Sequence, residues 1–211
     1  MNKSQKDRDF SDGLKLPLSE EFYSIQGEGF HTGKAAYFIR IGGCDIACSW
    51  CDTKFSWESE CYQTVRIDEI IRNILKNNAD SIMVTGGEPS MFNLEPLTVL
   101  SHKYNIKTYL ETSGNHKITG EWDWVCLSPK QCQPPVIENY LVANELKVII
   151  KSKSDLNWAE NCSKQISINC KLFLQPEWSC IKMITPKIVE YIKKNPRWNL
   201  SLQVHKYIGI P

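Results

Sequence analysis

Three cysteines lie close together at Cys44, Cys48 and Cys51, with the spacing C-x3-C-x2-C. Three thiolates in one short loop can ligate one metal centre. A four-iron cluster has four irons to ligate, so three cysteines leave one iron open to another ligand. A catalytic zinc site keeps a comparable open position for water or substrate. The spacing therefore favours an iron–sulfur cluster with one reactive position.

A zinc site or a redox cysteine loop is the alternative to a cluster at this position. Structural zinc sites are usually closed by four ligands, typically arranged as two pairs. The chain has no second C-x2-C pair, and the nearest histidine, His31, has no ligand spacing. The spacing thus favours a cluster without excluding zinc or unligated thiols.

Six further cysteines are scattered along the chain, and none forms a C-x2-C pair. They are Cys61, Cys126, Cys132, Cys162, Cys170 and Cys180. We expect buried thiols, because free cysteine behaves as a small apolar residue; a second cluster built from distant positions is the alternative. The N-terminal residues lack the apolar core of a signal peptide, and the chain contains nine cysteines. Together these features favour a reducing, cytoplasmic location.

The charge balance, 25 basic and 24 acidic residues among 211, predicts neither a nucleic-acid nor a membrane partner. No apolar run approaches the ~20 residues of a membrane span. The N-terminal residues are polar, so we expect a flexible tail over residues 1–17 and a single domain over residues 18–211.

Apolar runs with strand character alternate with runs of helical periodicity. Strands are predicted at 36–41, 81–85, 107–111, 125–127, 146–150, 172–174 and 200–204, and helices at 67–75, 93–103 and around 188–192. This alternation is typical of a mainly parallel sheet with helical crossovers, and so of an α/β fold.

Almost every predicted strand ends in a short polar or glycine-rich motif. The motifs are 42–44, 85–89, 111–114, 128–130, 175–178 and 205–206. Because the carboxyl ends of parallel strands share one face, six motifs there predict one site built from many loops. Ordinary turn chemistry is the alternative for each motif by itself.

The cysteine loop together with Thr85-Gly86-Gly87-Glu88-Pro89 resembles the radical S-adenosylmethionine superfamily. The resemblance implies that the open iron binds the cofactor's amino-acid end and that the glycines let the backbone approach it. It also implies that Glu88 and Pro89 shape the turn, and that the Glu88 carboxylate can accept a hydrogen bond from the cofactor ammonium. We expect an incomplete (partial) β/α TIM-like barrel, since 211 residues are fewer than the ~250 of a complete barrel.

Further motifs sharpen the resemblance. They are Glu20–Gly29, Phe38–Arg40, Cys51-Asp52-Thr53 with Trp57, Ser128-Pro129-Lys130 and Gln175-Pro176. In this order they resemble the 7-carboxy-7-deazaguanine synthases, over about residues 18–211. That resemblance implies a lyase of queuosine and 7-deazapurine biosynthesis. It contracts the ring of 6-carboxy-5,6,7,8-tetrahydropterin with loss of ammonia, after a 5'-deoxyadenosyl radical takes a hydrogen from C6.

The same resemblance implies the roles of individual residues. Cys44, Cys48 and Cys51 ligate the 4Fe-4S cluster, and the Thr53 hydroxyl binds Mg²⁺, which prefers oxygen ligands. S-adenosyl-L-methionine meets Ser49, Trp50, Cys51, Asp52, Gly87, Ser128, Pro129, Lys130, Gln175, Pro176, Glu177 and Trp178. The pterin meets Ile25, Gln26, Gly27, Arg40, Thr85 and Pro211.

Three of these roles have stated alternatives. The planar fork of Arg40 suits the substrate carboxylate, with a surface ion pair as the alternative. The terminal carboxylate of Pro211 folds back to the pterin near His205 in the family, with a frayed end as the alternative. The acid–base residue stays undecided among Asp52, Glu28 and Glu111, because geometry must come first.

Partners follow from the resemblance as well: a reductant such as flavodoxin or ferredoxin, and a second copy in a homodimer. The loop 51–66 contains three aromatic residues, Phe55, Trp57 and Tyr62. We expect them either to pack inside this loop or to contact the reductant. Two rival functions stay open. One is another radical enzyme, such as a glycyl-radical activase; the other is a zinc- or cluster-binding module without catalysis.

Overall fold

The computed structural model describes residues 10–211, and within them nine strands form one sheet in the order β3-β1-β2-β4-β5-β6-β7-β8-β9. The strands are β1 (Lys15–Ile25), β2 (Ala35–Ile41), β3 (Thr64–Arg66), β4 (Ser81–Gly86), β5 (Lys107–Thr112), β6 (Trp124–Leu127), β7 (Glu145–Ile150), β8 (Lys171–Pro176) and β9 (Trp198–Leu200). The helices are α2 (Ile67–Lys76), α3 (Glu95–Lys103), α4 (Ile137–Val142), α5 (Lys153–Ser163), α6 (Ile181–Lys194) and α7 (Val204–Ile208).

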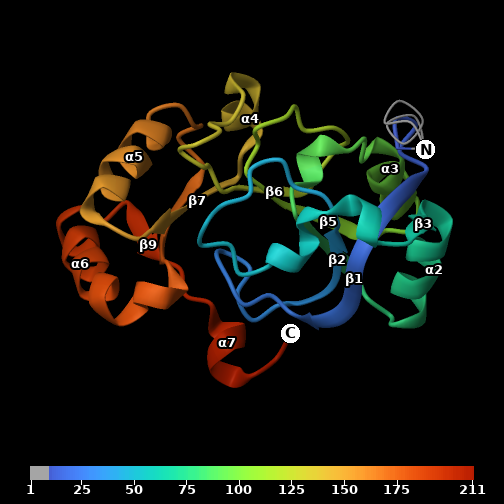
Figure 1. The fold of residues 1–211 in the computed structure, drawn as a ribbon, viewed down its shortest axis with the longest axis horizontal. Helices are drawn as coiled ribbons and strands as arrows, with labels where there is room; N and C mark the ends of the chain where they lie inside the picture. Colours follow the sequence, from blue (N-terminus) through green and yellow to red (C-terminus); the bar gives the residue numbers. More distant parts are fainter. Residues whose placement is uncertain (1–9) are drawn as a thin grey trace.

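The sheet is parallel from β2 through β9, whereas β1 pairs antiparallel with both β2 and β3. Its two edge strands, β3 and β9, do not pair with each other, so the barrel stays open. In Figure 1, α2 and α3 flank one end, α5 and α6 the other, and α4 lies between them. This arrangement confirms the predicted incomplete β/α barrel.

The outer face of the sheet is apolar and packs against the helices in two clusters. The first lies under α2 and α3, where Ile67, Ile70, Ile71 and Ile74 form the buried face of α2. The second lies under α4, α5 and α6 and includes fully buried Leu146. Burying a side chain of this size contributes about 1.5–3 kcal/mol, so the outer face supplies much of the stability.

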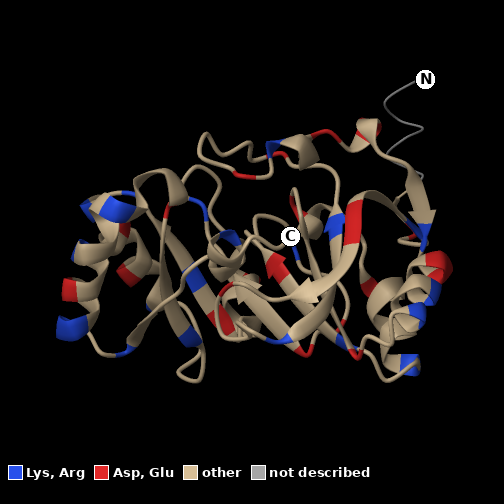
Figure 2. Cartoon of the chain, turned by 90° about the horizontal axis from the view of Figure 1, so that it is seen from below, with Lys and Arg blue, Asp and Glu red and all other residues tan. Residues whose placement is uncertain are grey.

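The inner face of the sheet carries charged and polar side chains. Along β7, Glu145 and Lys147 alternate with the apolar Leu146 and Val148, and all four are buried. Charged residues lie on the strands themselves as well as on the helices (Figure 2). Because strand side chains alternate between faces, one strand can serve an apolar exterior and a polar interior.

The C-terminal strand differs from the prediction. A strand over 200–204 is wrong: β9 is Trp198–Leu200, and residues 204–208 form α7. Trp198 is buried and donates its indole N–H to Glu160 at 2.8 Å, which fixes the strand register at this residue. The amide of Val204 then donates to the carbonyl of Gly27, so the chain turns toward the mouth of the barrel.

The start of the folded region also differs from the expected boundary at residue 18. Strand β1 begins at Lys15, and Leu16, which is fully buried, pairs with Val65. The rest of the expected tail, residues 1–9, lies outside the described residues. In the described part, no helix is long and apolar enough to cross a membrane.

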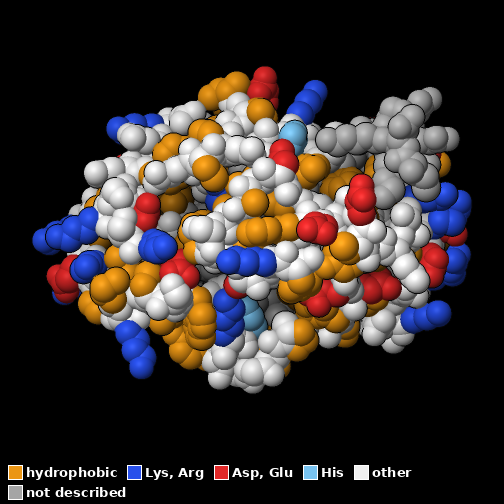
Figure 3. Space-filling view, in the orientation of Figure 1, with side chains coloured by type: hydrophobic (Ala, Val, Ile, Leu, Met, Phe, Trp, Pro, Cys, Tyr) orange, Lys and Arg blue, Asp and Glu red, His pale blue; other side chains and the backbone are white. Residues whose placement is uncertain are grey.

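The scattered cysteines divide into two groups. Cys126, Cys162 and Cys170 are buried as expected, whereas Cys61 and Cys132 are exposed and Cys180 is intermediate. On the face seen in Figure 3, acidic and basic side chains are interspersed, in keeping with the near balance of charge in the sequence.

Candidate active site

A cavity of about 430 Å³ opens at the carboxyl ends of the parallel strands. All six strand-end motifs contribute to its lining, including Cys44, Thr85, Glu88, Glu111, Ser128, Lys130, Gln175, Trp178 and His205. The motifs therefore form one site and are not separate turns. The motif at 205–206 reaches the cavity from α7 rather than from a strand end.

The cysteine loop is fixed to the segment that follows it. The amide of Gly43 donates to Ser56 O at 2.7 Å, and that of Cys44 donates to Trp57 O at 3.0 Å. Cys44, Cys48 and Cys51 are half-buried, and all three line the cavity. Burial raises the pKa of the Cys48 thiol to about 11 despite the nearby Lys130 cation. A bound metal reverses this preference because it binds the thiolate.

The thiols fit a cluster better than a single zinc ion. Among residues 10–211, no three His, Cys, Asp or Glu side chains are grouped as ligands of one ion. Zinc needs four ligands at about 2.0–2.3 Å from one point, whereas a four-iron cluster takes each thiolate on a different iron. The three thiols that line this one cavity therefore suit a cluster with one open iron.

The glycine segment after β4 lies directly against the cysteine loop. The amide of Gly87 donates to Ile41 O and that of Glu88 to Gly43 O, both at 2.8 Å. A Cβ at Gly87 would lie 2.1 Å from Gly43 O, so only glycine fits here. This glycine therefore lets the turn pack against the cysteine loop, and Gly86 and Gly87 both line the cavity.

Glu88 braces this turn, in agreement with the first of its two expected roles. It is 2% exposed and accepts from Ser90 N at 2.9 Å, Ser90 Oγ at 2.7 Å, Ser113 N at 2.8 Å, and Thr112 Oγ1. Four donors are about as many as a carboxylate accepts. Its oxygens thus join the ends of β4 and β5, and the expected bond to a cofactor ammonium is not supported by these contacts.

Most residues expected to meet S-adenosylmethionine line the cavity. They are Trp50, Cys51, Asp52, Gly87, Ser128, Lys130, Gln175, Pro176, Glu177 and Trp178. The other two are absent from the lining: Ser49 is exposed, and Pro129 is buried. The Lys130 ammonium donates to Ser128 Oγ at 2.8 Å and lies 5.5 Å from the centre of the Trp50 ring.

The residues expected to meet the pterin also line the cavity, together with Thr53. They are Ile25, Gln26, Gly27, Arg40, Thr85 and Pro211. Arg40 is 17% exposed, and its Nε donates to Glu20 at 2.6 Å, so the ion pair named as its alternative exists. Within residues 10–211, its two terminal nitrogens make no hydrogen bond or ion pair, and Arg40 lines the cavity. Pro211 O accepts from Ser24 Oγ at 3.5 Å, which brings the chain end to the cavity.

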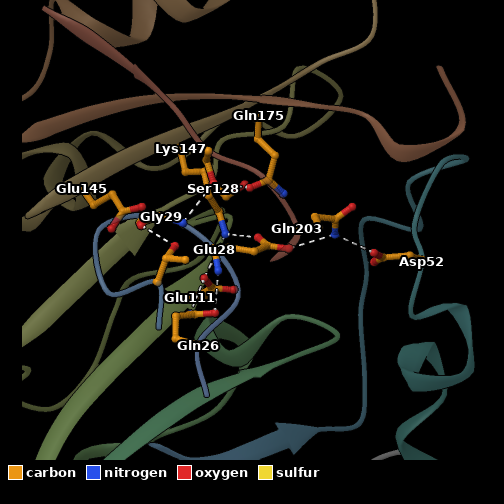
Figure 4. A network of polar contacts seen from close by, with 12 residues as sticks. Gln26, Glu28, Gly29, Asp52, Glu111, Ser128, Glu145, Lys147, Gln175 and Gln203 are labelled. Atoms are coloured by element: carbon orange, nitrogen blue, oxygen red, sulfur yellow. Dashed lines mark hydrogen bonds and ion pairs between the residues drawn. The ribbon is translucent and has the colours of Figure 1, made fainter. Parts of the chain in front are cut away.

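An ionic network lies at the inner end of the cavity, and sequence analysis missed its central residue. Lys147 is 3% exposed and forms ion pairs with Glu28 and, at 2.9 Å, with Glu111 (Figure 4). Gln203 Nε2 donates to Glu28 at 2.8 Å and to Asp52 at 3.0 Å. A lysine inside the otherwise apolar run 146–150 was the available signal.

The network sets the charge of its members. Burial by itself would raise the pKa of Glu28, but the Lys147 charge and hydrogen bonds from Lys147, Gln203 and Gln175 outweigh it and lower the pKa to about 2. Burial lowers the pKa of His205, whose ring lies against Gly27. The cavity thus presents an ionised Glu28 and, near neutral pH, an uncharged His205.

Comparisons with known proteins agree with this geometry. A family model described as a 4Fe-4S single cluster domain matches residues 25–166. A 7-carboxy-7-deazaguanine synthase of Flavobacterium psychrophilum is 51% identical over 94% of each chain, and that of Synechocystis is 42% identical over 93% of this chain and 94% of the relative. The crystal structure of QueE from Escherichia coli matches with a TM-score of 0.81 and 29% identity, over 95% of this chain and 99% of that one.

The chain belongs to the 7-carboxy-7-deazaguanine synthase family. In this family member the aromatic residues of the loop 51–66 differ in exposure. Trp57 lines the cavity, and Tyr62 packs against Gly42 and donates its hydroxyl to Phe55 O. Phe55 is 53% exposed beside the cysteine loop. Packing inside the loop therefore accounts for Trp57 and Tyr62 but not for Phe55.

Proposed function

We infer that this protein is a 7-carboxy-7-deazaguanine synthase, a radical S-adenosylmethionine lyase of queuosine biosynthesis. The observation that carries this function is the three-cysteine loop on a cavity formed by all six strand-end motifs, in a chain 51% identical to a synthase over 94% of its length. The substrate is 6-carboxy-5,6,7,8-tetrahydropterin, and the products are 7-carboxy-7-deazaguanine and ammonia.

The cofactor side of the cavity holds the groups that start the reaction. When bound, the cluster and S-adenosylmethionine supply a 5'-deoxyadenosyl radical that takes a hydrogen from C6 of the pterin. Cys44, Cys48 and Cys51 would hold three irons of the cluster, and the backbone of Gly87 would pass along the cofactor's amino-acid end. Lys130, whose ammonium lies 5.5 Å from the centre of the Trp50 ring in the cysteine loop, and Ser128 offer further polar contacts to the cofactor.

The substrate side is built for an anionic, hydrogen-bonding ring. Arg40 meets the substrate carboxylate with its terminal nitrogens while Glu20 holds its Nε. Glu28 and Glu111 accept from ring N–H groups, Gln26 bonds the amide-like edge, and the carboxylate of Pro211 closes the site. These contacts bind the pterin and exclude water from the radical.

A magnesium ion belongs to the proposal, with Thr53 as its protein ligand. The Thr53 hydroxyl lies on the cavity lining, 3.5 Å from Cys51 Sγ, between the cysteine loop and the substrate side. Mg²⁺ keeps open positions for substrate oxygens, so one threonine and the substrate carboxylate suit it. Omitting Mg²⁺ and substituting Thr53→Ala should each raise the KM for the pterin.

The partners are proposals as well. A flavodoxin or ferredoxin supplies the electron in the cytoplasm, and exposed Phe55 beside the cysteine loop is a contact for it. The functional unit is a homodimer, as the family resemblance implies. Light scattering of the reconstituted protein tests the dimer, and a Phe55→Ala variant with a lower rate on flavodoxin but not on dithionite tests the contact.

One anaerobic assay tests the function. The reconstituted protein is incubated with the carboxytetrahydropterin, S-adenosylmethionine, Mg²⁺ and dithionite, with a Cys51→Ala variant as the matched control. We expect deazaguanine from the wild type only. Cofactor cleavage without pterin turnover favours another radical enzyme, and a protein without iron–sulfur absorbance favours a zinc-binding module.

A chain extended beyond Pro211 tests the terminal carboxylate. We expect about tenfold weaker pterin turnover, because the extension moves the charge away from the cavity. The iron content and cofactor cleavage without pterin serve as controls and should stay unchanged. Full activity of the extended chain removes this role for Pro211.

A further inference from the structure

Lys147 is the buried cation of the cavity that no step above uses. It lies on β7, with its ammonium between Glu28 from the loop after β1 and Glu111 from β5 (Figure 4). The three residues are far apart in sequence and meet only inside the barrel. A buried lysine with two carboxylate partners needs an explanation, because removing charges from water is costly.

The ammonium is the common anchor of both carboxylates. Glu111 also accepts from Gln26 Nε2 at 3.3 Å, and Gln26 Oε1 accepts from the amide of Glu28 at 3.1 Å. Both donors to Glu111 bond its Oε1, so its Oε2 has no donor among the described residues, whereas Glu28 accepts Lys147 on one oxygen and Gln203 on the other; both residues line the cavity. Rotation of either one away from Lys147 would break a charge-assisted bond, so the cation fixes their direction.

Other titratable groups interact with this trio from the neighbouring elements. They are Glu145 on β7, Cys126 on β6, Lys130 after β6, Asp52 after the cysteine loop and His205 on α7. Burial would lower the pKa of Lys147, but the charges of Glu111 and Glu28 outweigh it and raise that pKa well above its usual range. A proton held so firmly is not available for transfer, so Lys147 acts by position.

We propose that Lys147 is a positioning residue for the ring contraction, whose ammonium anchors the carboxylates of Glu28 and Glu111 and directs them at the pterin. The proposal rests on the function above, because it assigns both carboxylates to the N–H groups of that substrate. Without the cation, the two neighbouring, part-buried carboxylates repel each other, which favours uptake of a proton by the pair. A protonated carboxyl then presents a donor where the ring needs an acceptor.

The test compares Lys147→Met with Lys147→Arg in the reconstituted holoenzyme. At pH 7 we expect kcat/KM for the pterin to fall about 100-fold in the methionine variant, mainly through KM, and less than about tenfold in the arginine variant. In the methionine variant kcat/KM should rise with pH between about pH 6 and 9, as the shared proton leaves. Iron content and cofactor cleavage without pterin should match the wild type.

A matched control removes a cation from a carboxylate far from the cavity. Arg197→Met breaks the ion pair with Glu160 and should lower the melting temperature while leaving the pH profile unchanged. A folded Lys147→Met protein with the wild-type kcat/KM and pH profile overturns the proposal. No deazaguanine from the wild type is a separate result, which removes the function itself.

A second comparison tests the proposal if the Lys147→Met variant does not fold. The double variant Lys147→Met with Glu111→Gln restores the net charge of the trio, and its pterin dissociation constant is compared with that of Glu111→Gln alone. Positioning by Lys147 predicts at least about tenfold weaker binding in the double variant, because Glu28 then lacks its anchor. Equal dissociation constants overturn the proposal.

Discussion

Two carboxylate networks lie on opposite faces of the same sheet. The inner one joins Glu28 and Glu111 to Lys147, which is 3% exposed and lines the cavity. The outer one joins Glu160 of α5 to Arg197 and to Tyr191 of α6. Both use charge-assisted hydrogen bonds, yet the inner network directs acceptors at a cavity and the outer one fastens helices together.

Position relative to the sheet, and not residue type, therefore decides what these part-buried carboxylates do. Glu160 accepts from Tyr191 Oη at 2.6 Å and Trp198 Nε1 at 2.8 Å, and these partners belong to elements it holds in place. Glu28, by contrast, accepts from Lys147 and Gln203, and all three residues line the cavity. We therefore expect mutations outside to change stability and mutations inside to change catalysis.

Substitution of Leu146 on β7 should have the largest effect on the free energy of unfolding. Leu146 is fully buried on the outer face, and Lys147 follows it on the inner face. Leu146→Ala should lower the free energy of unfolding by about 3 kcal/mol through lost burial and a residual cavity. Chemical denaturation measures this. A large change in the KM for the pterin, with stability unchanged, would contradict the division between faces.

The second prediction concerns low pH, which should weaken the inner network and lower the free energy of unfolding. The pKa of Glu28 is about 2 in the folded protein and 4.5 ordinarily. Because its pKa is lowered in the folded protein, ionised Glu28 contributes roughly 3 kcal/mol to the free energy of unfolding. This contribution is complete above about pH 4.5 and is lost as the pH falls toward 2. In the Glu28→Gln variant, the free energy of unfolding should therefore fall less steeply between pH 4.5 and pH 2. Identical acid profiles for the two proteins would refute this origin of the effect.

Removing the carboxylate charge of the outer network should have a smaller effect on the free energy of unfolding. Glu160→Gln removes the charge that Arg197 pairs with, and two further donors lose their ionic acceptor. We expect a loss of about 1–2 kcal/mol in unfolding free energy, with kcat/KM for the pterin unchanged. Thermal denaturation and the anaerobic assay measure the two quantities. Reduced turnover at full stability would show that the outer network also serves the site.

Local patterns in the sequence predicted much of the sheet. The apolar runs of β2, β4, β5, β6, β7 and β8 identified these strands, and isoleucine spacing identified α2. Strand β1, the short β3, and helices α4 and α5 were not predicted. A capping box at Ser152 and Asp155 was a local signal for α5 that the analysis did not use.

The sequence by itself determined the reactive loop of this protein. Cys44, Cys48 and Cys51 fall within eight residues, and Gly87 belongs to a five-residue motif, so short-range spacing specifies both. Only the tertiary structure decided which charges meet inside the barrel. Lys147 lies 119 residues from Glu28 and 36 from Glu111, and the strand order of the open barrel brings them together on its inner face. No periodicity or spacing encodes such a contact, because it depends on which strands become neighbours and which way their side chains face.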